Sequence, residues 1–146
     1  MNNGQLTQQF QAALRASQQK RWRNVEIILV IHDDPRSKWT VRRILEPAGY
    51  GVITADSGPI AVNVIRTIKP RLVVADVRLQ GNSAQDLCRQ IRAESKTVPF
   101  LVLSAIGDVA DVVRLLELGA DGYMAEPFSP VEFLARVRVA MRHFKI

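Results

Sequence analysis

With 146 residues, 47% hydrophobic and 23% charged, the chain has the length and composition of one globular domain with a buried core. Its single cysteine, Cys88, excludes an internal disulfide and a multi-cysteine metal site. The net charge of +6 is uneven, because residues 1–24 hold four basic residues and no acid, which leaves the remainder close to neutral.

Membrane insertion and secretion are not expected from this sequence. No apolar run reaches the roughly 18 residues that a membrane span needs, and no signal-peptide pattern opens the chain. We therefore expect a cytoplasmic protein without membrane contacts.

Residues 1–24 form a basic, glutamine-rich extension with two open interpretations. Leu6, Phe10 and Ala13 recur at spacings of three and four, which predicts a modest amphipathic helix. This helix either lies on the domain, or belongs to an arm that docks a partner or nucleic acid and stacks Trp22 on it. Four bases are few for the second role, so we treat the extension as accessory to a domain over residues 25–146.

From residue 25 onward, apolar strands alternate with amphipathic helices. The predicted strands cover residues 25–31, 50–55, 72–75, 98–103 and 123–125. The predicted helices cover residues 35–46, 57–68, 83–93, 108–118 and the stretch from 130 onward. In the last helix, we expect four residues to face inward: Val131, Leu134, Val137 and Met141.

This alternation predicts a parallel sheet covered by helices on both faces. Right-handed crossovers then give an α/β, flavodoxin-like doubly wound fold with strand order 2-1-3-4-5, five flanking helices and an extra N-terminal helix. Ligands bind such sheets at the carboxyl ends of the strands, beside the switch point between the first and third strands. Those two strands run into Asp33 and Asp76.

The residues at these strand ends point to phosphoryl and metal chemistry. Two carboxylates that meet at a switch point repel unless a hard cation such as Mg²⁺ lies between them. A carboxylate also accepts phosphoryl groups, and Ser104 at the next strand end offers a hydroxyl to a phosphoryl oxygen. Each residue alone has an ordinary explanation as a cap or turn residue, but their combination at successive strand ends favours a site.

From Val25 to Phe144 the chain resembles the receiver domain of two-component response regulators. Four stretches carry the resemblance: ILVIHDDP at 28–35, LVVADVRL at 72–79, LSA at 103–105 and LELGADGYMAEPFSP at 116–130. The last stretch is most similar to DNA-binding regulators with a winged-helix output domain, the OmpR/PhoB type.

The resemblance implies a role for each residue at the strand ends. Asp76 becomes the phosphoacceptor, and Mg²⁺ is bound by Asp33, Asp76 and the backbone carbonyl of Arg78. Ser104 and Tyr123 occupy the switch positions of the family, where phosphorylation draws the hydroxyl toward the phosphate and turns the aromatic ring inward.

The resemblance also implies partners. We expect a sensor histidine kinase or another signalling protein as the partner. The surface formed by helix 108–118, strand 123–125 and the last helix is then remodelled by phosphorylation and offers a homodimer face. DNA is reached only through a separate output domain.

Two departures from the family pattern affect the site directly. His32 stands where the family usually has an acid next to Asp33, and a neutral imidazole does not replace a carboxylate toward a hard cation. Glu126 stands where the family has the lysine that pairs with the phosphoacceptor and contacts the phosphoryl group. A carboxylate at this position repels the phosphoryl group that a lysine would attract, which disfavours phosphoryl transfer and the phosphorylated product. A minor alternative is that Glu126 acts as an extra metal ligand.

Smaller departures lie further along the chain. Gln80 and Ala84 replace the proline and glycine that usually open the following helix, and Gly122 removes an aspartate that pairs with Arg136 across the dimer in the winged-helix subgroup. The residues left for a dimer face are Asp121, Arg138, Val113, Leu116 and Leu134. Ordinary helix packing and solvated charge explain the same residues equally well.

We therefore predict an atypical receiver, a signalling module and not a metabolic enzyme, with weak or absent phosphorylation at Asp76 and output through protein contacts. The alternative is a conventional phosphorelay receiver that accepts phosphate from a histidine kinase and controls transcription through an output domain absent from this chain. A flavodoxin-like nucleotide binder is disfavoured because no glycine-rich loop follows the first strand. DNA binding by the domain itself is disfavoured by its near-neutral charge.

Overall fold

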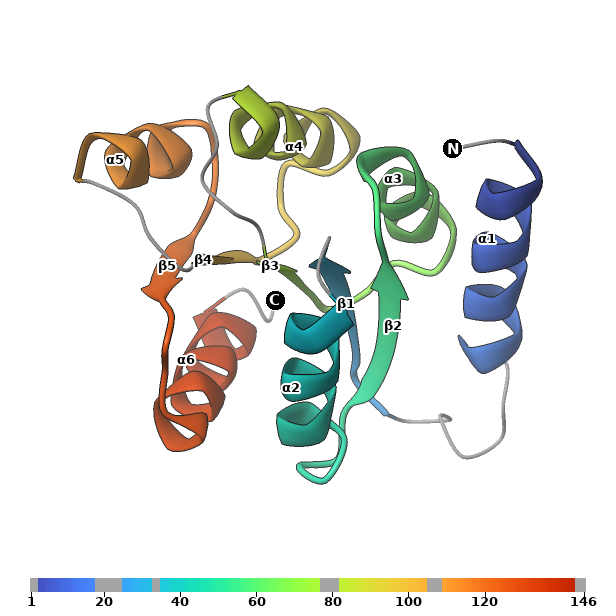
Figure 1. The fold of residues 1–146 in the computed structure, drawn as a ribbon, viewed down its shortest axis with the longest axis horizontal. Helices are drawn as coiled ribbons and strands as arrows, with labels where there is room; N and C mark the ends of the chain where they lie inside the picture. Colours follow the sequence, from blue (N-terminus) through green and yellow to red (C-terminus); the bar gives the residue numbers. More distant parts are fainter. Residues whose placement is uncertain (1–2, 18–24, 33–34, 77–81, 105–108, 144–146) are drawn as a thin grey trace.

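The computed structural model describes residues 3–17, 25–32, 35–76, 82–104 and 109–143. Helices and strands alternate along these residues (Figure 1): α1 (Asn3–Ser17), β1 (Ile27–His32), α2 (Pro35–Leu45), β2 (Gly51–Ala55), α3 (Gly58–Thr67), β3 (Leu72–Asp76), α4 (Asn82–Glu94), β4 (Phe100–Ser104), α5 (Val109–Glu117), β5 (Gly122–Ala125) and α6 (Pro130–His143). This order confirms the predicted elements, whose ends shift by one or two residues. None of the described helices is long and apolar enough to cross a membrane.

The strands form one parallel sheet in the order β2-β1-β3-β4-β5, which confirms the predicted topology. β1 lies between β2 and β3, and its register places His32 opposite Asp76. On the other side of β3, Asp76 lies opposite Leu103, the residue before Ser104. The carboxyl ends of β1, β3 and β4 therefore meet at one edge of the sheet.

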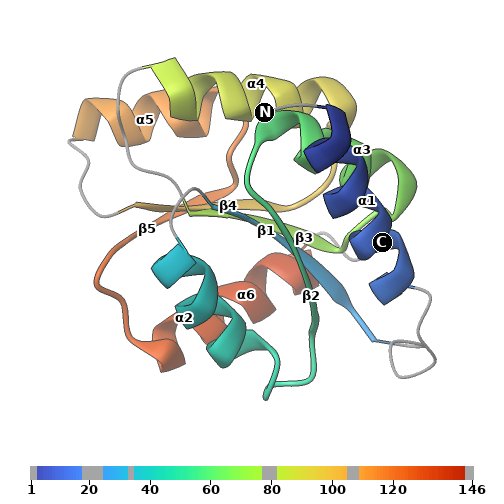
Figure 2. The same ribbon diagram turned by 45° about the vertical axis from the view of Figure 1, so that its right-hand side comes forward.

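Helices cover both faces of the sheet (Figures 1 and 2). α2 and α6 lie on one face, whereas α3, α4 and α5 lie on the other. Successive residues of β1 point to opposite faces, so Ile28 and Val30 enter the core beneath α2 and α6, and Leu29 enters the core beneath the other three helices. Because both faces are covered, the strand is apolar without alternation, as expected for a buried parallel strand.

The inward stripe of α6 differs from the prediction in one position. Phe133 and Val137 are fully buried, whereas Val131 is 78% exposed. At about 100° per residue, Val131 lies roughly 160° around the helix from Phe133, so both cannot face the sheet. The predicted spacing included Val131 and passed over Phe133, which is the residue that fills the core.

α1 lies beside α3 and along the β2 edge of the sheet (Figure 2). Ala13 is buried in the core beneath α3 and α4, and Phe10 packs against the same cluster. The Gln9 side-chain amide donates a hydrogen bond to Asp56 Oδ2 at 3.0 Å. The predicted extra helix is therefore confirmed, and it lies on the domain. The basic residues that follow it, together with Trp22, lie outside the described residues.

Arg92, near the end of α4, ties three segments together at the amino end of the sheet. Its Nε donates to the Gly119 carbonyl at 2.8 Å, and its Nη1 donates to the Val98 carbonyl at 2.7 Å. Its Nη2 lies 2.8 Å from Asp121 Oδ2, which also accepts the Phe100 backbone N–H at 2.8 Å. One guanidinium thus fixes the end of α4, the start of β4 and the turn into β5.

Candidate functional site

Three polar side chains are buried where β1, β3 and β4 end. His32 is 7% exposed, Asp76 is 6% exposed and Ser104 is fully buried. They are the polar or charged side chains that fall in the buried class among the described residues. Burying a carboxylate is costly, so a concentration of polar groups in an otherwise apolar core marks this edge as the functional end of the sheet.

Glu126 joins this cluster directly after β5. Its backbone N–H donates to the Ser104 carbonyl at 2.8 Å, which holds the residue beside the end of β4. Within the described part of the chain, its Oε1 is buried and accepts no hydrogen bond. A buried carboxylate oxygen without a donor is unfavourable unless a cation meets it. Among the described residues, no cation or hydrogen-bond donor therefore compensates the Glu126 Oε1 atom.

Tyr123 lies in β5, opposite Val102 of β4. Its ring packs against the core beneath α3, α4 and α5, and its hydroxyl is buried without a partner among the described residues. The ring is therefore turned inward. In the receiver family, an inward ring at this position accompanies phosphorylation and the remodelling of the α5, β5 and α6 surface.

The described residues supply part of the predicted metal site. Asp33 and the Arg78 carbonyl lie outside the described residues, and within those residues no group of three or more His, Cys, Asp or Glu side chains is arranged to hold a metal ion. Asp76 and Glu126 offer carboxylate oxygens, which hard cations prefer, whereas the imidazole of His32 does not suit Mg²⁺. The described carboxylates thus fit Mg²⁺ in kind, and binding by Asp33 and the Arg78 carbonyl stays a prediction.

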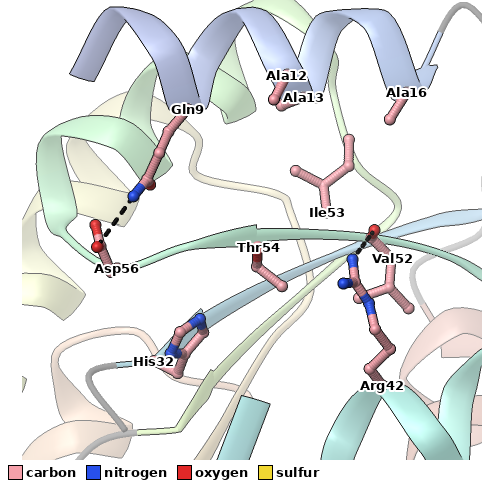
Figure 3. A pocket seen from close by; sticks show the side chains of 10 residues that line it. All are labelled: Gln9, Ala12, Ala13, Ala16, His32, Arg42, Val52, Ile53, Thr54 and Asp56. Carbon is pink, nitrogen blue, oxygen red and sulfur yellow. Dashed lines mark hydrogen bonds between the residues drawn. The ribbon is translucent and has the colours of Figure 1, made fainter. Parts of the chain in front are cut away.

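His32 also borders a cavity of about 220 Å³ between α1, β2 and α2 (Figure 3). Its ring lies beside Thr54 at one end of this cavity. At the other end, Arg42 of α2 donates from Nη2 to the Val52 carbonyl at 3.1 Å and so caps the outer edge of β2. The residue that replaces a family acid therefore ends β1 beside Asp76 and lines a cavity whose opposite wall is α1.

A family model for the response regulator receiver domain matches residues 28–138, which is more than half of the chain. The chain belongs to the response regulator receiver family. The match begins in β1, so α1 lies outside the part shared with other receivers.

Curated relatives of this receiver are transcriptional regulators. It is 42% identical over 123 residues to the protein named probable transcriptional regulator ycf27 of Cyanophora paradoxa, covering 82% of this chain and 49% of that protein. It is 40% identical over 115 residues to the DNA-binding response regulator MtrA of Mycolicibacterium smegmatis, covering 79% of this chain and 50% of that protein. The predicted similarity to the OmpR/PhoB type is confirmed, and the chain spans about half the length of the curated relatives it matches.

Solved structures agree with the observed fold. A response regulator structure from Chloroflexus aurantiacus matches with a TM-score of 0.74 at 33% identity, covering 82% of this chain and 99% of that one. The receiver domain of the sensor histidine kinase PA1611 from Pseudomonas aeruginosa matches with a TM-score of 0.72 at 25% identity, covering 81% and 98% of the two chains. The latter structure has a magnesium ion coordinated in its active-site cleft.

The predicted dimer face of this receiver is formed by α5, β5 and α6. Val113 and Leu116 remain 44% and 42% exposed on α5. Two charged residues of this face have partners inside the chain, since Asp121 is bound to the α4 guanidinium and Arg136 Nε lies 3.4 Å from Glu132 Oε1. Val113 and Leu116 thus remain exposed for a partner, whereas Leu134 packs against the core and Asp121 is paired with Arg92.

Sequence reasoning missed the role of Arg92 entirely. In the helical pattern it is one more basic residue on an amphipathic helix, like its exposed neighbour Arg89. Its acceptors are mostly backbone carbonyls in later turns, and carbonyls leave no signature in a sequence. The sequence also gives no sign that the Oε1 atom of Glu126 is buried, although it shows that Glu126 takes the place of the family lysine.

Proposed function

We propose that this receiver is atypical, with weak or absent phosphorylation at Asp76 and output through protein contacts. The observation that carries the proposal is Glu126, whose Oε1 is buried without a hydrogen-bond donor in the described part of the chain, next to the end of β4. In the family pattern, this position supplies a cation to the phosphoryl group.

The charges at this site oppose phosphorylation. Asp33, Asp76 and Glu126 bring three carboxylates to a site where the family pattern combines its carboxylates with an ammonium group. An incoming phosphoryl group adds negative charge, and like charges raise the energy of both the transition state and the phosphorylated product. Burial strengthens this repulsion because the effective dielectric constant is lower than in water.

In this proposal Mg²⁺ is the cofactor, and the site binds it with lower affinity than an ordinary receiver does. Asp33, Asp76 and the Arg78 carbonyl would hold the ion, which supplies positive charge to phosphoryl oxygens when bound. His32 adds no oxygen ligand, and Glu126 contributes a further carboxylate near the site. The magnesium ion in the PA1611 receiver supports Mg²⁺ as the cation, while the strength of binding here is part of the proposal.

We further propose how the chain is organised and where it acts. Residues 1–24 form an extension to a receiver over residues 25–146, and the protein works in the cytoplasm with a sensor histidine kinase or another signalling protein. The surface of α5, β5 and α6 carries the output, through Val113 and Leu116 in a homodimer or with another partner. DNA is reached only through a separate output domain, in keeping with relatives that are about twice as long.

A second candidate function is a conventional phosphorelay receiver that controls transcription. It is favoured by identities of 40% or more to response regulators named as transcriptional regulators or DNA-binding proteins. It is also favoured by the positions of Asp76 and Ser104 at the ends of neighbouring strands, where the family pattern has its phosphoacceptor and its switch hydroxyl.

Intact mass separates the two candidates. The protein is incubated with Mg²⁺ and acetyl phosphate, with Asp76→Asn as the control that lacks the phosphoacceptor. The atypical receiver gains little or no phosphate under conditions that fully modify an ordinary receiver run in parallel. Rapid, stoichiometric phosphorylation that depends on Asp76 establishes the conventional function instead.

A further inference from the structure

Besides the cavity beside His32, the described residues form a groove at the amino ends of β3 and β4, away from the predicted phosphoacceptor Asp76. Its volume is about 410 Å³, and its walls are the segment from α3 into β3 and the turn from α4 into β4. β3 has five residues and separates the groove from Asp76 at its carboxyl end by roughly 16 Å. The groove is therefore not part of the site described above.

The groove combines an apolar floor with basic walls. Four lining residues are buried and apolar: Ile65, Pro70, Val98 and Pro99. The lining residues include three cations, Arg66, Lys69 and Arg71, against the single carboxylate of Glu94. The hydroxyl-bearing side chains of Ser95 and Thr97 line the same groove.

The carboxylate is already used by the fold. Arg66 donates from Nε to Glu94 Oε1 at 2.9 Å and from Nη2 to Oε2 at 3.0 Å, which joins α3 to α4. Arg71 Nη2 lies 3.9 Å from Glu26 Oε2 in a loose, solvent-exposed pair. Lys69 has no ion-pair partner among the described residues. The groove therefore keeps net positive charge at Lys69 and Arg71.

Lys69 has an unfavourable backbone conformation for a lysine. Its φ of 57° lies in the left-handed region, and its N–H donates to the Val64 carbonyl at 3.3 Å at the end of α3. Glycine takes this position at lower cost, and a residue before a proline, here Pro70, favours extended backbone. This backbone conformation places the Lys69 side chain on the wall of the groove at a local energetic cost, which points to a use for its ammonium group.

We propose that this groove binds a phosphate-bearing anion of about the size of a nucleoside monophosphate. Lys69 and Arg71 meet the phosphate, hydroxyl donors line the groove beside them, and the organic body rests on the apolar floor. A nucleic-acid polymer fits less well, because the chain beyond residue 24 is close to neutral and offers no long basic track.

Amide NMR spectra of the complete chain test this assignment. Adenosine monophosphate and, separately, inorganic phosphate are titrated at constant ionic strength with EDTA present, so that Mg²⁺ does not engage Asp76. Both are expected to shift the amides of Lys69, Arg71 and Thr97 in a saturable manner at low-millimolar concentrations, with tighter binding of the nucleotide. Absence of saturation, shifts confined to the Asp76 end of the sheet, or equal affinity for the two anions overturns the proposal.

Two lysine variants make the test specific. Lys69→Gly removes the ammonium and relieves the left-handed backbone, so the thermal midpoint rises while the affinity for adenosine monophosphate falls about five-fold. Lys96→Gln removes the same charge from an exposed residue of the α4–β4 turn that does not line the groove, and leaves the affinity unchanged. Wild-type affinity in Lys69→Gly, or an equal loss in both variants, contradicts the proposed site.

Discussion

Replacing Arg92 with alanine removes a guanidinium that binds acceptors from three separate segments. Arg92 donates to the carbonyls of Gly119, Ser95 and Val98 at distances of 2.7 to 3.1 Å, and it pairs with Asp121 at 2.8 Å. Alanine cannot replace any of these donors, so the end of α4 and the turns into β4 and β5 lose their common link.

The expected loss of stability in Arg92→Ala follows from the partial burial of Arg92 and Asp121. The side chains of Arg92 and Asp121 are 16% and 24% exposed, so the pair is only partly screened by solvent. A net hydrogen bond contributes about 1 kcal/mol, and bonds to charged groups contribute more, although water reaches some of the freed acceptors. We expect Arg92→Ala to lower the free energy of unfolding by about 3 kcal/mol, and the melting temperature by roughly 10 °C.

Urea unfolding followed by circular dichroism measures this loss, with Arg89→Ala as the matched control. Arg89 lies on the same helix and pairs with Asp86 at 3.1 Å, but the two side chains are 53% and 62% exposed. An exposed pair of this kind contributes about 0.5 kcal/mol or less. If Arg92→Ala destabilises the protein no more than Arg89→Ala does, the central role given to Arg92 is refuted.

Three further predictions concern other parts of the molecule. Ala13→Asp places a carboxylate in the core beneath α1, so hydrogen exchange across residues 3–17 accelerates, whereas the same change at the exposed Ala12 has little effect. Burial raises the pKa of the Cys88 thiol to about 11 from 9.0, so the unfolded state ionises first. The stability of the wild type relative to Cys88→Ala, measured by urea unfolding, is then constant below pH 9 and declines between pH 9 and 11; a constant difference contradicts this burial. Leu116→Glu places a charge on the proposed dimer face, and light scattering is expected to show a dimer for the wild type and a monomer for the variant; equal masses for the two proteins contradict this face.

The sheet was predictable because its strands carry a strong local signal. Unbroken apolar runs such as Leu72–Ala75 indicate strands covered on both faces, and right-handed crossovers leave one strand order for the alternating pattern. The same signal located Asp76 and Ser104, because each follows the last apolar residue of its strand. The inward-facing residues of α6 were less predictable, because Val131 and Phe133 are two residues apart and lie on opposite sides of the helix.

Other features depend on contacts that are distant in sequence. Arg92 binds carbonyls as far away as Gly119, and no local pattern marks a carbonyl as an acceptor. The sequence left Asp121 open between a dimer-face residue and a solvated charge, and it gave no sign that its carboxylate binds the Phe100 N–H and Arg92 inside the chain. The predicted metal ligands Asp33 and Arg78 lie outside the described residues and stay predictions.

The rate of phosphorylation at Asp76 in the wild type and in Glu126→Lys tests the central claim most directly. Both proteins are incubated with Mg²⁺ and acetyl phosphate, and the phosphorylated fraction is followed by intact mass over time. We predict that the lysine raises the rate by at least about tenfold, equivalent to about 1.4 kcal/mol in the barrier, because it restores a cation beside the phosphoryl group. Rapid phosphorylation of the wild type, with no further gain in Glu126→Lys, would contradict the account.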